Sequence, residues 1–141
     1  MFKELFKRSN RKEPPEERFF SSIYGYSDIK KLLMRAIVSR ESISILLCGP
    51  PASSKTVFLM EIIRGLDNTC YIDCTNTTGA GLVDRLFNND IRYLLLDELE
   101  KMSKKDQNVL LNVIETGMLI ETKVSKTRSK QMKNPKGLCY Y

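Results

Sequence analysis

The sequence predicts an α/β fold, a three-layer αβα sandwich in which a parallel sheet lies between two layers of helices. The first observation is that short apolar runs alternate with longer segments whose apolar residues recur at helical spacing, as in right-handed strand–helix–strand crossovers. The second is that one apolar run stops at a glycine. A loop of small residues comes next, and a helix follows the loop. The third is that a later run stops at two acidic residues. In parallel sheets such strand ends meet at one edge, where ligands bind.

The elements behind this prediction follow one another between residues 21 and 133. A helix is predicted to begin at Ser27 or Asp28, because apolar residues then recur on one face. The basic residues of its other face are Lys30, Lys31 and Arg35. The apolar run 44–48 is typical of a strand buried on both faces. Further strands are predicted over 69–74 and 91–96, and further helices over 55–66, 80–87 and 104–116.

The two ends of the chain differ from this core. Residues 1–20 are polar and basic, with two prolines in the middle, and are predicted to form a flexible basic arm ahead of a core over residues 21–141. Residues 118–133 first alternate like a strand and then carry only basic charges, which predicts a basic hairpin. The tail over residues 134–141 shows no clear element.

Composition narrows the function classes. The chain has 141 residues, a hydrophobic fraction of 42% and a net charge of +6, which suit one packed domain and permit an anionic partner without requiring one. The four cysteines form no CxxC pair and there is no histidine, which argues against zinc and for reduced thiols. No apolar run approaches the roughly 20 residues that span a membrane. We therefore expect a cytoplasmic protein without membrane contact, whose hydrolytic chemistry would depend on carboxylates.

The segment GPPASSKT, residues 49–56, has the composition of a phosphate-binding loop and stands between an apolar strand and a helix. Unpaired N–H groups and the positive end of the helix dipole attract phosphates there. We expect Lys55 to neutralise the outer phosphates and Thr56 to ligate Mg²⁺. The standard pattern GxxxxGK[ST] has glycine where this chain has Ser54. The other residues expected to line the nucleotide are Gly49, Pro50, Pro51, Ala52, Ser53, Ser54 and Val57.

The acidic pair Asp97 and Glu98 follows the apolar run of RYLLLDELE, about 40 residues after the loop. At the carboxyl end of its strand, Asp97 would face the Mg²⁺ held by Thr56, and Glu98 would polarise a water for attack on the outer phosphate. A helix cap after a strand is the alternative interpretation. The combination of loop, strand order and spacing favours the interpretation in which Asp97 and Glu98 take part in catalysis.

Together these residues resemble the AAA+ superfamily of P-loop NTPases. The loop 49–56 is similar to the family's Walker A motif, and residues 93–98 are similar to its Walker B motif. The segment IYGYSDIKKLL is similar to the family's adenine-proximal segment, although a simple turn before a helix would also account for it. The resemblance implies ATP and Mg²⁺ as cofactors, with Lys55 and Glu98 in catalytic roles. It also implies that Ile23, Tyr24 and Gly25 lie by the base.

Over roughly residues 20–133 the chain is similar to RuvB-like archaeal ATPases, which are related in motif style to Holliday-junction and minichromosome-maintenance helicases. The stretch DELEKMSKKDQNVLLNVIETGMLIETKVSKTRS carries this similarity. It implies a DNA helicase or translocase-type motor, a homo-oligomeric ring, and possible DNA contact through residues 123–136.

The chain departs from that family after the hairpin. An AAA+ module continues with two more strands, a polar sensor residue, arginines and a helical lid, and none of these is expected here; Asn134 follows no apolar strand. The first and third strands are then expected to lack a partner on one side. Two alternatives remain: a truncated nucleotide-binding fragment without autonomous ATPase activity, and a basic nucleic-acid-binding protein with an incidental loop.

Overall fold

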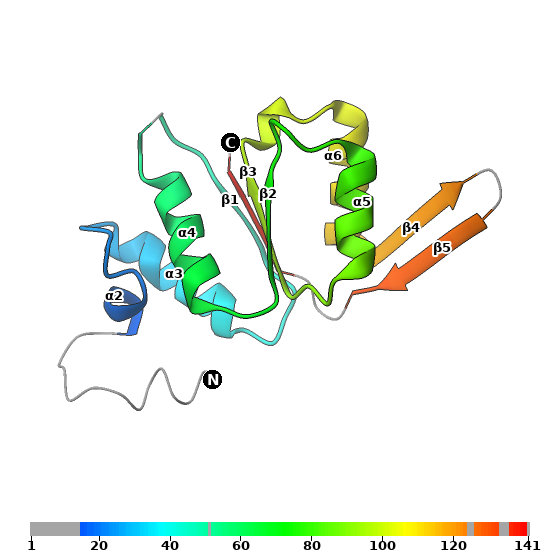
Figure 1. Ribbon diagram of the computed structural model, residues 1–141. Helices are drawn as coiled ribbons and strands as arrows, with labels where there is room; N and C mark the ends of the chain where they lie inside the picture. The colour runs from blue at the N-terminus through cyan, green and yellow to red at the C-terminus, as the bar shows by residue number, and fades with distance from the viewer. Residues whose placement is uncertain (1–14, 51, 124–125, 133–135, 141) are drawn as a thin grey trace.

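The computed structural model describes residues 15–50, 52–123, 126–132 and 136–140 as an α/β fold (Figure 1). Four strands form one parallel sheet in the order β1-β6-β3-β2. The strands are β1 (Ser44–Leu47), β2 (Thr69–Asp73), β3 (Tyr93–Asp97) and β6 (Lys136–Tyr140). The predicted parallel α/β architecture is therefore confirmed.

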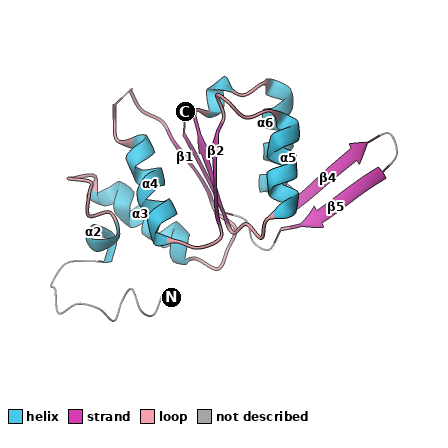
Figure 2. Ribbon diagram, viewed as in Figure 1, coloured by secondary structure: helices cyan, strands magenta, loops and turns pink. Residues whose placement is uncertain are grey.

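Helices cover both faces of this sheet (Figures 1 and 2). On one face lie α2 (Pro15–Phe19), α3 (Ser27–Val38) and α4 (Lys55–Gly65); on the other lie α5 (Gly79–Asn88) and α6 (Lys104–Thr116). Strand β3 is buried on both faces, because Leu95 packs in the core with α3 and α4 while Leu94 and Leu96 pack in the core with α5 and α6. A short 3₁₀ helix, η1 (Leu99–Lys101), follows β3. The helix predicted from Ser27 and the helix predicted over residues 55–66 are confirmed.

Strand β6 overturns the prediction for the tail of the chain. Residues 136–140 form a parallel strand that pairs with β1 on one side and β3 on the other, for example Gly137 with both Ser44 and Leu94. The expectation that the first and third strands lack a partner is therefore wrong. The segment KGLCY begins with lysine and glycine and does not form an uninterrupted apolar run. It is a strand because two distant strands supply its hydrogen-bond partners.

Strand β1 was predicted to be buried on both faces, and this is also wrong. It lies at the end of the strand order, its alternate residues are exposed, and Leu46 keeps 54% of its surface accessible. An apolar run indicates a strand, but its neighbours in the sheet decide whether both faces are covered.

The predicted flexible arm over residues 1–20 is wrong for its last six residues, since helix α2 forms and Phe20 is fully buried; residues 1–14 lie outside the described part. The prediction that Lys30 lies on the polar face of its helix is wrong too. Lys30 is 1% exposed, and its Nζ donates to Glu17 Oε2 at 2.5 Å and to the carbonyl of Ile23 at 2.6 Å. This ion pair joins α2 to α3.

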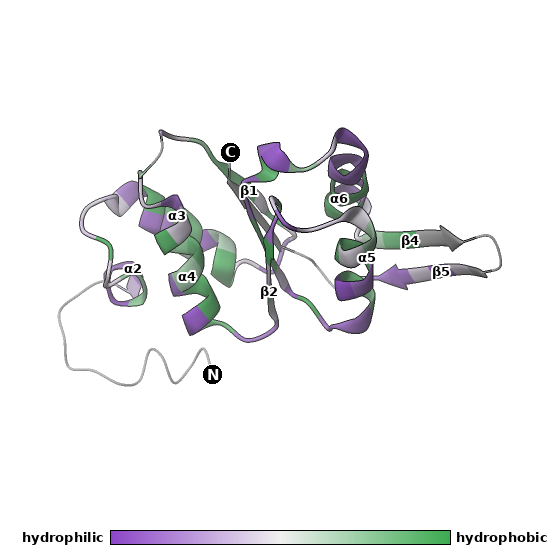
Figure 3. Ribbon diagram, turned by 45° about the horizontal axis from the view of Figure 1, so that its top comes forward, coloured by the Kyte–Doolittle hydropathy of each residue, from purple (hydrophilic) through white to green (hydrophobic). Residues whose placement is uncertain are grey.

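The predicted hairpin is confirmed as an antiparallel pair, β4 (Met118–Lys123) and β5 (Lys126–Gln131), which extends from the body of the molecule (Figure 2). Near its base β4 is apolar and β5 hydrophilic (Figure 3). Leu119, from β4, and Met132, just after β5, are buried with α5 and α6. Among the described helices, none is long and apolar enough to cross a membrane.

Candidate functional site

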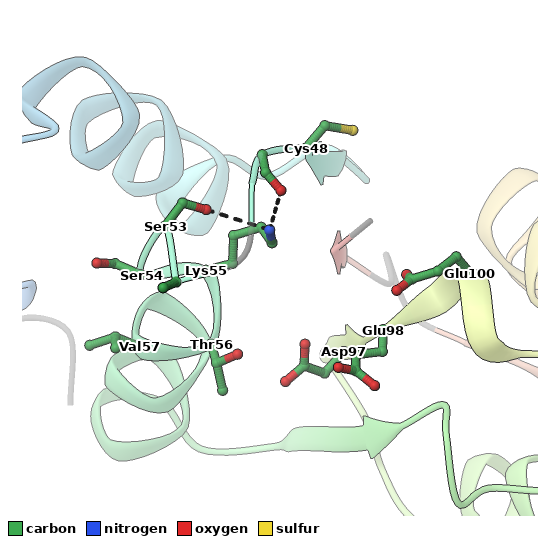
Figure 4. Close-up of a pocket in the computed structure, with 11 residues that line it drawn as sticks. Cys48, Ser53, Ser54, Lys55, Thr56, Val57, Asp97, Glu98 and Glu100 are labelled. Atoms are coloured by element: carbon green, nitrogen blue, oxygen red, sulfur yellow. Dashed lines mark hydrogen bonds between the residues drawn. The ribbon is translucent and has the colours of Figure 1, made fainter.

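A cavity of about 700 Å³ opens at the carboxyl ends of β1 and β3 (Figure 4). One wall is the loop after β1 with the first turn of α4, and the other is the end of β3 with the start of η1. The lining residues are Cys48, Gly49, Ala52, Ser53, Ser54, Lys55, Thr56, Val57, Asp97, Glu98 and Glu100. The two segments that the sequence singled out thus lie on opposite sides of one cavity.

The loop reaches the cavity through two residues in the left-handed region of backbone space. Ala52 has a φ of 61° and Ser54 a φ of 63°. Ser54 directly precedes α4, at the position where the standard phosphate-loop pattern has glycine. A residue with a Cβ is strained in this region by about 1–2 kcal/mol. The backbone therefore has the shape that glycine favours, although the side chain is serine.

Lys55 is the first residue of α4, and its ammonium group turns back onto the loop (Figure 4). It donates to the carbonyl of Gly49, to the carbonyl of Pro50 at 3.0 Å and to Ser53 Oγ at 3.4 Å. These are weak neutral acceptors for a full positive charge, and an anionic ligand would be a stronger partner. Pro51 lies outside the described residues.

Asp97 lies at the end of β3 and points toward Thr56 across the cavity (Figure 4). The hydroxyl of Tyr71, on β2, donates to Asp97 Oδ2 at 3.0 Å. Burial, followed by the hydrogen bond to Asp97, raises the pKa of Tyr71 to about 12. Sequence reasoning missed Tyr71, because only the register of β2 against β3 brings it beside Asp97.

Glu98 follows with a φ of 53° in the left-handed region, which turns its carboxylate to the turn after β2. Thr75 Oγ1 donates to Glu98 Oε2 at 2.6 Å. The turn is fixed by Asp73, whose carboxylate accepts from the Asn76 amide at 2.7 Å and the Thr75 N–H at 2.9 Å. These bonds, that of Asn76 above all, lower the pKa of Asp73. Thr75 was also missed, and the polar run TNTT after β2 was the available signal.

Several cavity residues carry oxygen ligands of the kind that Mg²⁺ takes, and among them the Thr56 hydroxyl and the Asp97 carboxylate lie on facing walls (Figure 4). Within the described residues, no group of three or more His, Cys, Asp or Glu side chains could hold a metal ion by itself. Mg²⁺ usually takes one or two protein oxygens and fills its other positions with waters and phosphate oxygens. The donor set here fits that type of site.

The segment that was expected to lie beside the adenine base, residues 23–25, does not line the cavity as the loop does. Ile23 is buried in the core with α3 and α4, Tyr24 is fully exposed, and Gly25 has a φ of 76°. The described lining of the cavity does not include these three residues. The segment contacts α4 one residue further on, where the rings of Tyr26 and Phe58 meet edge to face at 6.0 Å.

The basic hairpin contacts α5 through two of its charges. Lys130 Nζ donates to the carbonyls of Leu86 and Phe87, each at 3.1 Å, and of Asn89 at 2.5 Å. Arg128 pairs with Asp84 at 3.5 Å, and its guanidinium lies 4.9 Å from the ring centroid of Phe87. Residue 133 lies outside the described part, and so do the side chains of residues 123, 126 and 136.

Comparison with known proteins gives one weak relationship. No protein-family model matches the chain. The chain is 25% identical over 144 residues to a protein of Entamoeba histolytica named DNA replication licensing factor MCM3, and the match covers 80% of the chain. The chain spans 24% of that relative's length. This similarity supports an AAA+ relationship of the MCM type and adds nothing to the resemblance to RuvB-like proteins.

Proposed function

We propose that the chain binds ATP with Mg²⁺ in this cavity and forms the nucleotide-binding part of an AAA+ motor of the MCM type. The observation that carries the proposal is that the described residues of the loop after β1 face Asp97 and Glu98 across one cavity, at the carboxyl edge of a parallel sheet. The weak similarity to an MCM3 protein supports it independently.

In this proposal Lys55 exchanges its loop acceptors for phosphate oxygens, which bear more negative charge than the carbonyls of Gly49 and Pro50. The N–H groups of the first turn of α4 face the same phosphates. Thr56 and Asp97 would hold Mg²⁺, which when bound neutralises charge on the outer phosphates. The protein itself therefore contributes the positioning of the phosphates and positive charge beside them.

Hydrolysis is assigned to Glu98 as the group that orients the attacking water. Its carboxylate lines the cavity and is held at one oxygen by Thr75, which leaves the other oxygen to accept a proton from water. Three further elements remain proposals from the resemblance: a homo-oligomeric ring, a neighbouring arginine at the site, and action on DNA.

A second candidate is nucleotide binding without turnover. It is favoured by the hydrogen bond from Thr75, which engages one of the two Glu98 carboxylate oxygens that could orient a water. A third candidate is DNA binding through residues 123–136. Lys130 and Arg128 already bond to α5, so fewer of the cations in this segment are available to DNA phosphates.

The test is equilibrium binding of a fluorescent ATP analogue with Mg²⁺ to the wild-type chain and to Lys55→Ala. We expect saturable binding that Lys55→Ala weakens at least tenfold, since a charge-assisted bond to phosphate contributes roughly 1.5–3 kcal/mol. Lys31→Ala, an exposed lysine on α3, is the matched control and should bind like the wild type.

Glu98→Gln separates binding from turnover. It should retain nucleotide affinity and abolish phosphate release wherever the wild-type chain shows any. Wild-type binding without phosphate release would select the second candidate. Equal binding by Lys55→Ala and the wild type would refute the nucleotide site.

A further inference from the structure

Tyr71 is placed by the sheet register on the side of β2 that faces α4. It pairs with Leu95 in the neighbouring strand, and both side chains pack against the core with α3 and α4. Side chains two residues apart on a strand point to the same face, so Asp97 lies on this side as well. The phenol hydroxyl consequently reaches Asp97 Oδ2 at 3.0 Å across the strand pair.

We infer that Tyr71 is a positioning residue for the magnesium ligand Asp97, an inference that rests on the proposed nucleotide function. By donating to Oδ2, the hydroxyl fixes the carboxylate plane and leaves the other oxygen for the metal. Loss of a group that hydrogen-bonds a metal ligand without touching the metal commonly lowers metal affinity by roughly 10–100-fold.

A tyrosine suits this task because it is a neutral donor. Lysine or arginine at the same place would hold the carboxylate equally well, but its positive charge would repel Mg²⁺. A phenol is protonated at neutral pH, where its ordinary pKa of about 10 lies well above the pH of the solution, so the hydroxyl is available as a donor. The hydroxyl is also the one part of the side chain that phenylalanine would remove while the packed ring stayed in place.

The chain contains a matched control in Tyr93. It stands on β3 and is buried in the same core, and its hydroxyl donates to the carbonyl of Ile37 at 3.4 Å. Tyr93→Phe removes a sheet tyrosine hydroxyl without touching Asp97. A general effect of hydroxyl loss on the sheet should appear in both variants, whereas a magnesium effect should appear in Tyr71→Phe alone.

The experiment is a Mg²⁺ titration of fluorescent-nucleotide binding, with a parallel measurement in EDTA. We expect Tyr71→Phe to raise the half-maximal Mg²⁺ concentration roughly tenfold while affinity in EDTA stays at the wild-type value. Tyr93→Phe should match the wild type in both measurements. An unchanged Mg²⁺ midpoint in Tyr71→Phe, or an equal loss in EDTA, would overturn the inference.

Failure of the proposed function has a different signature. If the wild-type chain shows no binding that depends on Lys55, the nucleotide site is refuted, and the role of Tyr71 with it. If that binding is present and depends on Mg²⁺ equally in wild type and Tyr71→Phe, Tyr71 alone is refuted. Thermal unfolding and circular dichroism establish that each variant is folded.

Should Tyr71→Phe fail to fold, fluorine NMR of the wild-type chain grown on 3-fluorotyrosine provides the second measurement. The chain has six tyrosines, and the resonance of Tyr71 can be assigned from the other five Tyr→Phe variants. That resonance should shift when Mg²⁺ is added to the nucleotide complex. A resonance that stays unmoved while Mg²⁺ tightens binding would reject the inference.

Discussion

At the residue scale, Ser54 occupies a backbone conformation that favours glycine. We expect Ser54→Gly to increase the free energy of unfolding by about 0.5–1 kcal/mol, because relief of left-handed strain exceeds the extra entropy that glycine gives the unfolded chain. Urea unfolding followed by circular dichroism measures this. Ser53→Gly, one residue earlier and without a positive φ, should gain nothing. If both variants lost stability equally, the strain at Ser54 would be negligible.

A second residue-scale prediction concerns the ion pair between Lys30 and Glu17. The hydrogen bond from Lys30 lowers the pKa of Glu17 from the ordinary value of a glutamate. A carboxylate with a lowered folded pKa contributes stability above its unfolded pKa, and this contribution is lost as pH falls through the folded value. The wild-type melting temperature should therefore fall between about pH 5 and pH 3 in part through Glu17.

Glu17→Gln should lower the melting temperature by several degrees at pH 7, because buried Lys30 loses its carboxylate partner. The difference between variant and wild type should shrink as the solution becomes acidic. Glu16→Gln, at the neighbouring acid on α2, is the control. It should leave the dependence of melting temperature on pH nearly unchanged. A gap between Glu17→Gln and wild type that stayed constant down to pH 3 would contradict this account.

At the element scale, Lys130 joins the hairpin to the carboxyl end of α5. A cation among the last carbonyls of a helix is stabilised by the helix dipole as well as by hydrogen bonds. We expect Lys130→Ala to reduce the free energy of unfolding by about 1–2 kcal/mol. Arg128→Ala, which breaks an exposed pair with Asp84, should cost less than about 1 kcal/mol. Equal losses would mean that the cap on α5 contributes no more than a surface pair.

Helices α3, α4, α5 and α6 could be predicted because each carries its own helical periodicity, and β1, β2 and β3 because each is a short run rich in apolar residues. Helix α2 could not, because five residues are too few to show that periodicity. The predicted strand 69–74 and helix 104–116 agree closely with β2 (Thr69–Asp73) and α6 (Lys104–Thr116). Strand β6 could not be predicted, because its hydrogen bonds go to partners far away in sequence. The contacts that Tyr71 and Thr75 make with the acidic pair depend on strand register and turn geometry, which the residue pattern does not encode.

At the scale of the whole molecule, β1 and β2 are the outer strands of the described sheet. Strand β6 lies between β1 and β3 and joins β1 to the rest of the sheet. The loop after β1 and the acidic end of β3 face each other because β6 separates the two strands by one strand width on each side, about 4.8 Å per spacing. The position of β6 between these two strands therefore sets the width of the cavity.

The position of β6 also sets the order in which the protein can be assembled. Ser44 pairs with Gly137, so β1 has no permanent sheet neighbour until almost the whole stretch from residue 44 to residue 140 has left the ribosome. Until β6 is made, the loop after β1 and the acidic pair at the end of β3 are not held in place by a common neighbouring strand. Contacts so distant in sequence close slowly. The nascent chain is thus exposed, for the length of its synthesis, to any chaperone or partner that recognises an unpaired strand edge.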